Sequence, residues 1–317
     1  MGRVSLNLKS LSKNAMVYVA FVLFFVIFSI TLRNVGHGFL SPGNLWNIVR
    51  QTSLIAILSV GMTFALGAGQ IDLSIGSVVG VSSLTTALIV QSVGIVPGVL
   101  AGLTVGVVVG AFNGCLVAFL KVPPFIATFG TQIVFAGVAR TMTGLRSIPI
   151  TNSTFNYWFG GGDLGVVPVL LLWMLLVTVI GHIYLRKKPF GRQVLVVGGN
   201  RKAALYSGIS YKKTVIKVMM ISGTLAGLVG VLWSGRFGGG RYSLGAGEEA
   251  SAIAAAVIGG TSIFGGKASV VGACVGAVMM GMINNALVMY GLDVHMQMIV
   301  RGFIIIAAVA ITSNQSD

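Results

Sequence analysis

Acidic residues are scarce in this chain of 317 residues: there are six, against 21 lysines and arginines. Charged residues of both signs make up only 9% of the sequence, whereas 55% of the residues are hydrophobic. Such a composition leaves no stretch polar enough for a separate soluble domain. It predicts an all-α polytopic membrane protein, with one transmembrane domain over residues 1–317.

Cysteine and histidine are scarce as well. Cys115 and Cys274 both lie in apolar stretches, so we expect small buried side chains and neither a disulfide nor a metal pair. His37, His182 and His295 lie far apart, without the spacing of metal ligands. Because no acid, histidine and nucleophile are grouped as in a catalytic site, we expect no enzyme activity, no metal and no cofactor.

The net charge of +15 raises the question of nucleic-acid binding. The basic residues, however, lie in short segments between apolar runs, where the positive-inside bias and anionic membrane lipid explain them. We therefore expect lipid, and not nucleic acid, around this chain.

Long apolar runs indicate ten membrane spans, since a span needs about 17 to 25 mostly apolar residues. The first run lacks a small-residue cleavage site and is interpreted as a retained span. The predicted spans are 16–32, 47–68, 73–93, 97–120, 124–143, 165–185, 214–233, 249–265, 268–290 and 297–313.

Residues 186–217 contain nine lysines and arginines and no acid. The positive-inside rule places this loop in the cytoplasm. Both termini, Lys121 and Lys267 then lie inside as well, which predicts a multi-pass protein of a bacterial inner membrane. Four segments are expected outside, among them the Gly-rich turn around Gly239, which we interpret as flexible: 33–46, 144–164, 234–246 and 291–296.

Glycine recurs every four residues at Gly102, Gly106, Gly110 and Gly114. Small residues at this spacing let helix backbones approach closely, so we expect a packing ridge. A short repeat, LGAG, occurs at residues 66–69 and 244–247. Its offset of five spans indicates an inverted repeat of spans two to five and seven to ten.

Three acids, Asp72, Glu248 and Glu249, lie beside apolar spans. Each can be a helix cap, because a carboxylate accepts backbone N–H groups at a helix start, or part of a solute pathway. Polar residues within the spans, including Gln132, would suit a sugar-like solute or hold helices together. The candidate pathway or gate residues are Asp72, Ser74, Asn113, Thr128, Glu249, Asn284 and Asn285.

Residues 259–268 superficially resemble a phosphate-binding loop. Thr261 stands where the motif requires its first glycine, and Ala268 follows Lys267 where Ser or Thr is needed. We therefore expect that any ATP is hydrolysed by another chain.

The middle of the basic loop has the signals of a short helix. Asn200 can cap it, two turns can follow over residues 201–207, and Gly208 can end it. So short a helix is marginal alone and would be stabilised by a partner. The alternative is an ordinary basic cytoplasmic loop.

Several blocks in order resemble the permease subunits of ribose-type sugar ABC importers, over roughly residues 40–312. The sequence departs from the family at Gly69-Gln70, where a glycine or serine and then a glycine are usual, and at Ser251, where an acid is usual. The matching blocks are VGMTF (60–64), IDLSIGS (71–77), PFIAT (124–128), GR (191–192), VGGN (197–200), SGI (207–209), AIAAAVIGGTS (252–262), NN (284–285) and QMIVRG (297–302).

The resemblance implies a dimer with a second permease copy or a homologous permease, two cytoplasmic ATPase subunits and an extracytoplasmic sugar-binding protein. It also implies that the short helix is a coupling helix for the ATPase, with Ala203 and Ala204 as small contact residues. An ion-coupled secondary transporter is the alternative. The expected coupling residues are Asn200, Arg201, Lys202, Ala203, Ala204, Leu205, Ser207 and Gly208.

Overall fold

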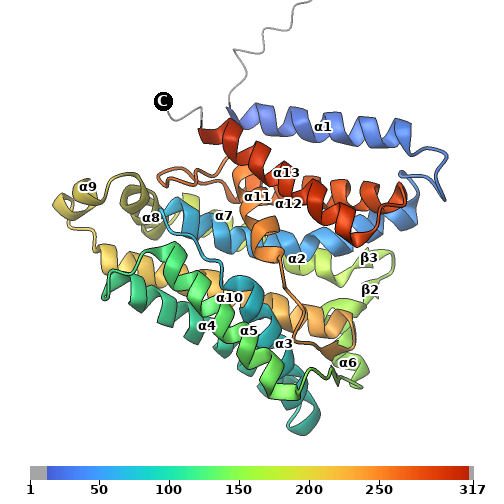
Figure 1. The fold of residues 1–317 in the computed structure, drawn as a ribbon, viewed down its shortest axis with the longest axis horizontal. Coiled ribbons are helices and arrows are strands. Elements are labelled where there is room, and N and C mark those ends of the chain that lie inside the picture. Colours follow the sequence, from blue (N-terminus) through green and yellow to red (C-terminus); the bar gives the residue numbers. More distant parts are fainter. Residues whose placement is uncertain (1–12, 314–317) are drawn as a thin grey trace, which may run out of the picture.

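The computed structural model describes residues 13–313, which fold into a bundle of helices with two small two-stranded sheets (Figure 1). The strands are β1 (Ile148–Pro149) with β4 (Gly239–Gly240), and β2 (Asp163–Leu164) with β3 (Val167–Pro168). The helices are α1 (Lys13–Thr31), α2 (Pro42–Gly67), α3 (Ile75–Ser92), α4 (Ile95–Ala118), α5 (Pro124–Thr143), α6 (Ser153–Asn156), the π-helix η2 (Tyr157–Gly161), α7 (Val169–Arg186), α8 (Pro189–Gly199), α9 (Arg201–Tyr206), α10 (Tyr211–Arg236), α11 (Glu248–Ile258), α12 (Val270–Met289) and α13 (Val294–Ser313).

Seven described helices are long and apolar enough to cross a membrane: α2, α3, α4, α5, α7, α10 and α12. Helices α1 and α13, with 19 and 20 residues, occupy the first and tenth predicted spans. Together these features establish an all-α polytopic membrane protein.

The predicted eighth span, 249–265, is wrong in length. Helix α11 has 11 residues, or about 17 Å, against a hydrocarbon core of about 30 Å. It stops at Ile258 because two glycines follow, and Gly260 adopts a positive φ of 88° that breaks the helix. Residues 259–269 continue as a loop.

The glycine ridge on α4 is confirmed as a packing surface. A Cβ on Gly106 would collide with the carbonyl oxygen of Gly223 on α10, and a Cβ on Gly110 with that of Met219. Gly276 on α12 lies equally close to the carbonyl oxygen of Ala255 on α11. Backbone-to-backbone contact therefore holds these helix pairs together, as small residues allow in a membrane.

The two ends of the bundle differ in structure. Figure 1 shows α8 and α9 at one end of the longest axis, and α6, β2 and β3 at the other. We call these the α9 end and the β end. At the β end, Arg50 forms an ion pair with Asp163 (2.7 Å), and β1 pairs with β4. Two of the segments expected to share one side of the membrane, 144–164 and 234–246, are joined here by the β1–β4 pair.

Two expectations, a flexible turn at Gly239 and a buried Cys115, are wrong. Gly239 and Gly240 are buried and pair with Pro149 and Ile148, so they form a strand and not a flexible turn. The side chain of Cys115 is exposed on α4, because the glycine ridge of that helix, and not its cysteine, faces α10.

Candidate functional site

The helix predicted in the basic loop is present as α9. The Asn200 side chain accepts a hydrogen bond from the backbone N–H of Ala203 (3.0 Å), as a helix cap does. Gly208 follows the helix with a φ of +71° and donates its N–H to the carbonyl of Leu205 (3.0 Å). The cap and the terminator are therefore confirmed.

The outer surface of α9 differs from the predicted one. Ala204 is fully buried against the chain's own fold, so it does not offer a contact to a partner, whereas Ala203 is exposed. Leu205 and Tyr206 are 71% and 88% exposed, so two large side chains lie next to each other on the outer surface of α9. Arg201, Lys202, Ser207 and Gly208 are also exposed.

A second helix of the loop, α8, was not predicted from the sequence. It begins with Pro189 in the first turn, a favoured position for proline, and buries Gly191, Val194 and Val197. That spacing of three residues is the signal that would have revealed it. Helix α8 links α9 to the bundle.

Helix α8 lies directly against the end of α2. A Cβ on Gly198 would collide with the carbonyl oxygen of Gly67, and it would approach Ala68 to 2.9 Å. The loop after α11 joins the same contact, because the N–H of Gly266 donates to the carbonyl of Gly67 (3.1 Å). Three segments far apart in sequence therefore meet where α2 ends.

Asp72 lies in the non-helical segment between α2 and α3 and is fully buried. Its Oδ1 accepts hydrogen bonds from the backbone N–H of Ser74 (3.1 Å) and from the Ser74 hydroxyl (2.6 Å). The buried hydroxyl of Ser222 on α10 lies close to the same carboxylate. The carboxylate therefore accepts a backbone N–H near the start of α3, as in the cap interpretation.

The network extends from Asp72 to α4 and α5. Asn113 donates from Nδ2 to the Ser74 hydroxyl (2.8 Å), and the Thr131 hydroxyl donates to Asn113 Oδ1 (2.6 Å). Both side chains are buried. Thr131 was not predicted, although it lies one helical turn after the predicted Thr128.

Thr128 lies next to this network. Its hydroxyl is 3.1 Å from the carbonyl oxygen of Ile71, the residue before Asp72, and 2.9 Å from that of Pro124. The structure therefore brings four predicted residues together: Asp72, Ser74, Asn113 and Thr128.

Glu249 connects to the same helix α5 at another point. Gln132 donates from Nε2 to Glu249 Oε1 (2.8 Å), and a Cβ on Gly76 would collide with Glu249 Oε2. The Glu249 carboxylate thus lies in the first turn of α11 and against the first turn of α3, where helix dipoles favour negative charge.

Helix α5 is held to the bundle by this polar side. Thr128, Thr131 and Gln132 occupy one face at helical spacing, and each bonds to a different segment. Its opposite face, with Phe129, Ile133 and Val134 among others, is exposed. Of the seven candidate spans, α5 is the least buried.

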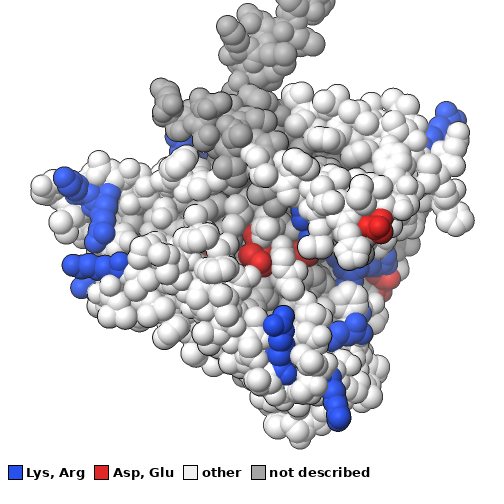
Figure 2. Space-filling model, in the orientation of Figure 1, with Lys and Arg blue, Asp and Glu red and all other residues white. Residues whose placement is uncertain are grey.

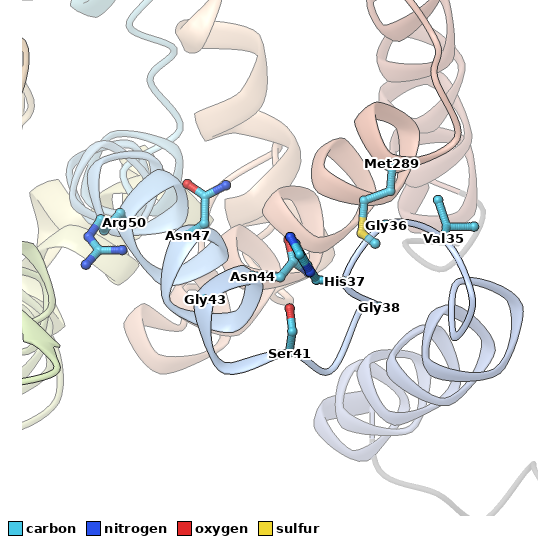
Figure 3. Close-up of a pocket in the computed structure, with 10 residues that line it drawn as sticks. All are labelled: Val35, Gly36, His37, Gly38, Ser41, Gly43, Asn44, Asn47, Arg50 and Met289. Carbon is cyan, nitrogen blue, oxygen red and sulfur yellow. The ribbon is translucent and has the colours of Figure 1, made fainter.

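Asn284 and Asn285 lie elsewhere, on α12. Asn285 and Asn44 exchange two hydrogen bonds between their amides, of 2.8 and 3.1 Å. This amide pair lies beside a pocket of about 870 Å³, which Figure 3 shows between the α1–α2 loop, α2 and α12. Asn284 is half-buried, and its Oδ1 accepts no hydrogen bond from the described residues.

The part of the chain that the structure describes contains no group of three His, Cys, Asp or Glu side chains placed to hold a metal ion. Its polar centres are hydrogen-bonding networks of carboxylates, amides and hydroxyls.

Comparison with known proteins shows the family of this chain. The family model of the permease component of branched-chain amino acid transport systems matches residues 44–309. The chain belongs to this family. It is 36% identical over 298 residues to the ribose import permease protein of Bacillus subtilis, covering 93% of this chain and 91% of that one.

Two further relatives carry other sugars in their names. The D-allose transport system permease protein of Escherichia coli is 36% identical, covering 86% of this chain and 84% of its own. The L-arabinose ABC transporter permease protein of Azospirillum brasilense is 31% identical. The match covers 92% of this chain and 85% of the relative. No solved structure matches the chain.

Proposed function

We propose that this chain is the transmembrane permease subunit of an ABC importer that moves a sugar or sugar-like solute into the bacterial cytoplasm. The relatives, all named as permeases, and the exposed, capped helix α9 support this function together. The chain itself binds and moves solute, while separate subunits hydrolyse ATP. Its partners in this proposal are two cytoplasmic ATPases, an extracytoplasmic sugar-binding protein and a second permease.

The capped, exposed helix α9 is the observation that carries the proposal. A capped six-residue helix with a leucine and a tyrosine pointing outward has the features of a small protein-binding surface. Its basic neighbours Arg201 and Lys202 agree with a cytoplasmic position, as do the positively charged residues of the whole loop. Both termini then lie in the cytoplasm, and the β end faces the binding protein.

A continuous series of contacts leads from α9 into the bundle. Gly198 of α8 lies in direct backbone contact with Gly67 at the end of α2. A movement of α9 that displaces α8 would therefore be passed to α2. The segment after Gly67 contains Asp72, which connects through Ser74 and Asn113 to α5. We propose that this route couples ATP binding and hydrolysis to movement of α5, and so opens and closes the solute pathway.

We propose that the face between α5 and α13 contacts the second permease. The solute pathway would run along this face. Its outer helices expose apolar side chains, yet Glu248 and Glu249 lie between them at the start of α11. Ionisable groups at such a place are too costly to face lipid and are expected to face protein or a water-filled path. A second permease copy, or a homologous permease, would cover this face.

Ten membrane-inserted helices and an inverted repeat complete the proposal. Helix α2 packs against α11 and α12 as α10 packs against α3 and α4, and α3 contacts α5 as α11 contacts α13. This parallel contact pattern supports a repeat of α2–α5 and α10–α13. In it, the short α11 corresponds to α3 and enters the membrane only part of the way.

Affinity purification of the chain from its native membrane tests the assignment. We expect an ATP-binding chain to be recovered with it in stoichiometric amount, and that recovery to fail when Tyr206 is replaced by alanine. Recovery of the intact permease with no ATP-binding chain would contradict the proposal.

A further inference from the structure

Charged groups gather at one place in the middle of the bundle. Figure 2 shows acidic residues near the centre of one face, with basic residues to one side of them. Glu248 and Glu249 begin α11, and Arg301 of α13 lies close enough to Glu248 for their charges to attract. Gln132 of α5 completes the group through its hydrogen bond to Glu249.

Several polar atoms in this group lack a hydrogen-bond partner among the described residues. These atoms are both acceptors and donors, and burial without a partner is unfavourable for each of them. They are Glu248 Oε2, Glu249 Oε2 and Arg301 Nε.

The chemistry of these atoms restricts what could satisfy them. Two carboxylates and one guanidinium leave the group with a net negative charge, which would repel an anionic solute. Hydroxyl groups donate to carboxylate oxygens and accept from a guanidinium N–H without adding charge. A neutral solute with several hydroxyls therefore matches the whole set.

The position of the group suits a contact with a passing solute. Glu249 touches the first turn of α3 at Gly76, Gln132 belongs to the weakly held α5, and Arg301 belongs to α13. A change in the position of α5 or α13 would therefore alter the spacing between the carboxylates, the amide and the guanidinium.

We propose that Glu248, Glu249, Arg301 and Gln132 form a constriction that binds the hydroxyls of a neutral polyhydroxylated solute as it passes. Arg301 supplies the positive charge that acts on Glu248. The inference rests on the proposed function, and it assigns solute contact to Gln132, which bonds to Glu249, and to Arg301, whose charge acts on Glu248.

The test uses the complete complex of permease, ATPase and binding protein in vesicles, with radiolabelled D-ribose, D-allose and L-arabinose as probes. Two variants, Glu249→Gln and Arg301→Gln, are compared with the wild type. We expect solute uptake per ATP hydrolysed to fall by about tenfold or more, the scale of losing a hydrogen bond to a charged group. The control is Asp293→Asn, because Asp293 is exposed and caps α13 through an oxygen that Asn keeps.

A third variant, Gln132→Leu, guards against simple misfolding, since Gln132 is half-buried on the least buried span. We expect the same loss of uptake per ATP, with the complex still assembled. Uptake per ATP at the wild-type level in Gln132→Leu, or in both charge variants, would overturn the constriction. Absence of ATP-dependent uptake of every probe by the wild type would overturn the proposed function as well.

Discussion

Gly198 of α8 lies directly against the backbone of Gly67 at the end of α2, with no space for a side chain between them. Because α8 leads to α9, this contact joins the proposed ATPase-binding surface to the segment that contains Asp72.

We predict that Gly198→Ala weakens this contact and uncouples ATP hydrolysis from uptake. The added Cβ would collide with the Gly67 carbonyl, and overpacking of this kind typically costs about 1–3 kcal/mol. Gly199→Ala is the matched control, because its Cβ would lie at an ordinary distance of 3.5 Å from Gly266. Equal uptake per ATP in the two variants would exclude the contact from the coupling route.

The exposed pair on α9 gives a second prediction. Replacing Leu205 and Tyr206 with alanine removes two large side chains that touch little of the chain itself, so the permease should remain stable. Binding of the ATPase should weaken by about 2 kcal/mol or more, as for a residue at the centre of an interface. Titration of the purified ATPase onto the permease measures this, with Lys188→Ala as control. Unchanged affinity would contradict the coupling role and favour the alternative interpretation, an ordinary basic cytoplasmic loop.

Asp72 distinguishes the cap from the gate. In Asp72→Asn, the oxygen that accepts from Ser74 is kept, so the protein should assemble normally. Loss of the charge should nevertheless slow uptake if Asp72 belongs to the gate, as we propose. Normal uptake by a well-assembled Asp72→Asn protein would leave Asp72 only its structural role.

The glycine ridge predicts a loss of stability without any loss of a polar group. Gly106→Ala should lower the free energy of unfolding by about 1–3 kcal/mol, because α4 and α10 have to separate. Thermal unfolding in detergent measures the effect. Gly137→Ala on α5 is the control, since no atom lies within 4 Å of its added Cβ, and an equal loss there would contradict the packing account.

Local signals in the sequence predicted the parts of the fold that depend on few neighbours. The Asn200 cap, the Gly208 terminator and the spacing of Gly102 to Gly114 act over one or two turns and are confirmed. Local signals could not predict that α10 packs on this ridge, because only the three-dimensional arrangement brings Gly223 to Gly106.

The candidate site was predicted in part for the same reason. Asp72, Asn113 and Thr128 were recognisable as polar residues in apolar surroundings, and the fold brings them together. Thr131 and Ser222 look like ordinary helix residues until α5 and α10 are placed beside Asp72. The burial of Ala204, likewise, follows from the path of the loop and not from its sequence.

The orientation in the membrane is tested by thiol labelling in a background lacking the exposed Cys115. A cysteine at Val166, at the β end, should react with an impermeant reagent added outside, and one at Lys187 should not. The reverse pattern would place α9 outside and remove the docking of a cytoplasmic ATPase.

The energy source of uptake tests the central claim most directly. Vesicles containing the permease, its ATPase and the binding protein should accumulate sugar when ATP is supplied to the α9 side, with no ion gradient across the membrane. Omitting the ATPase should abolish accumulation. Accumulation driven by a proton or sodium gradient in vesicles containing the permease alone would contradict the account and favour an ion-coupled transporter.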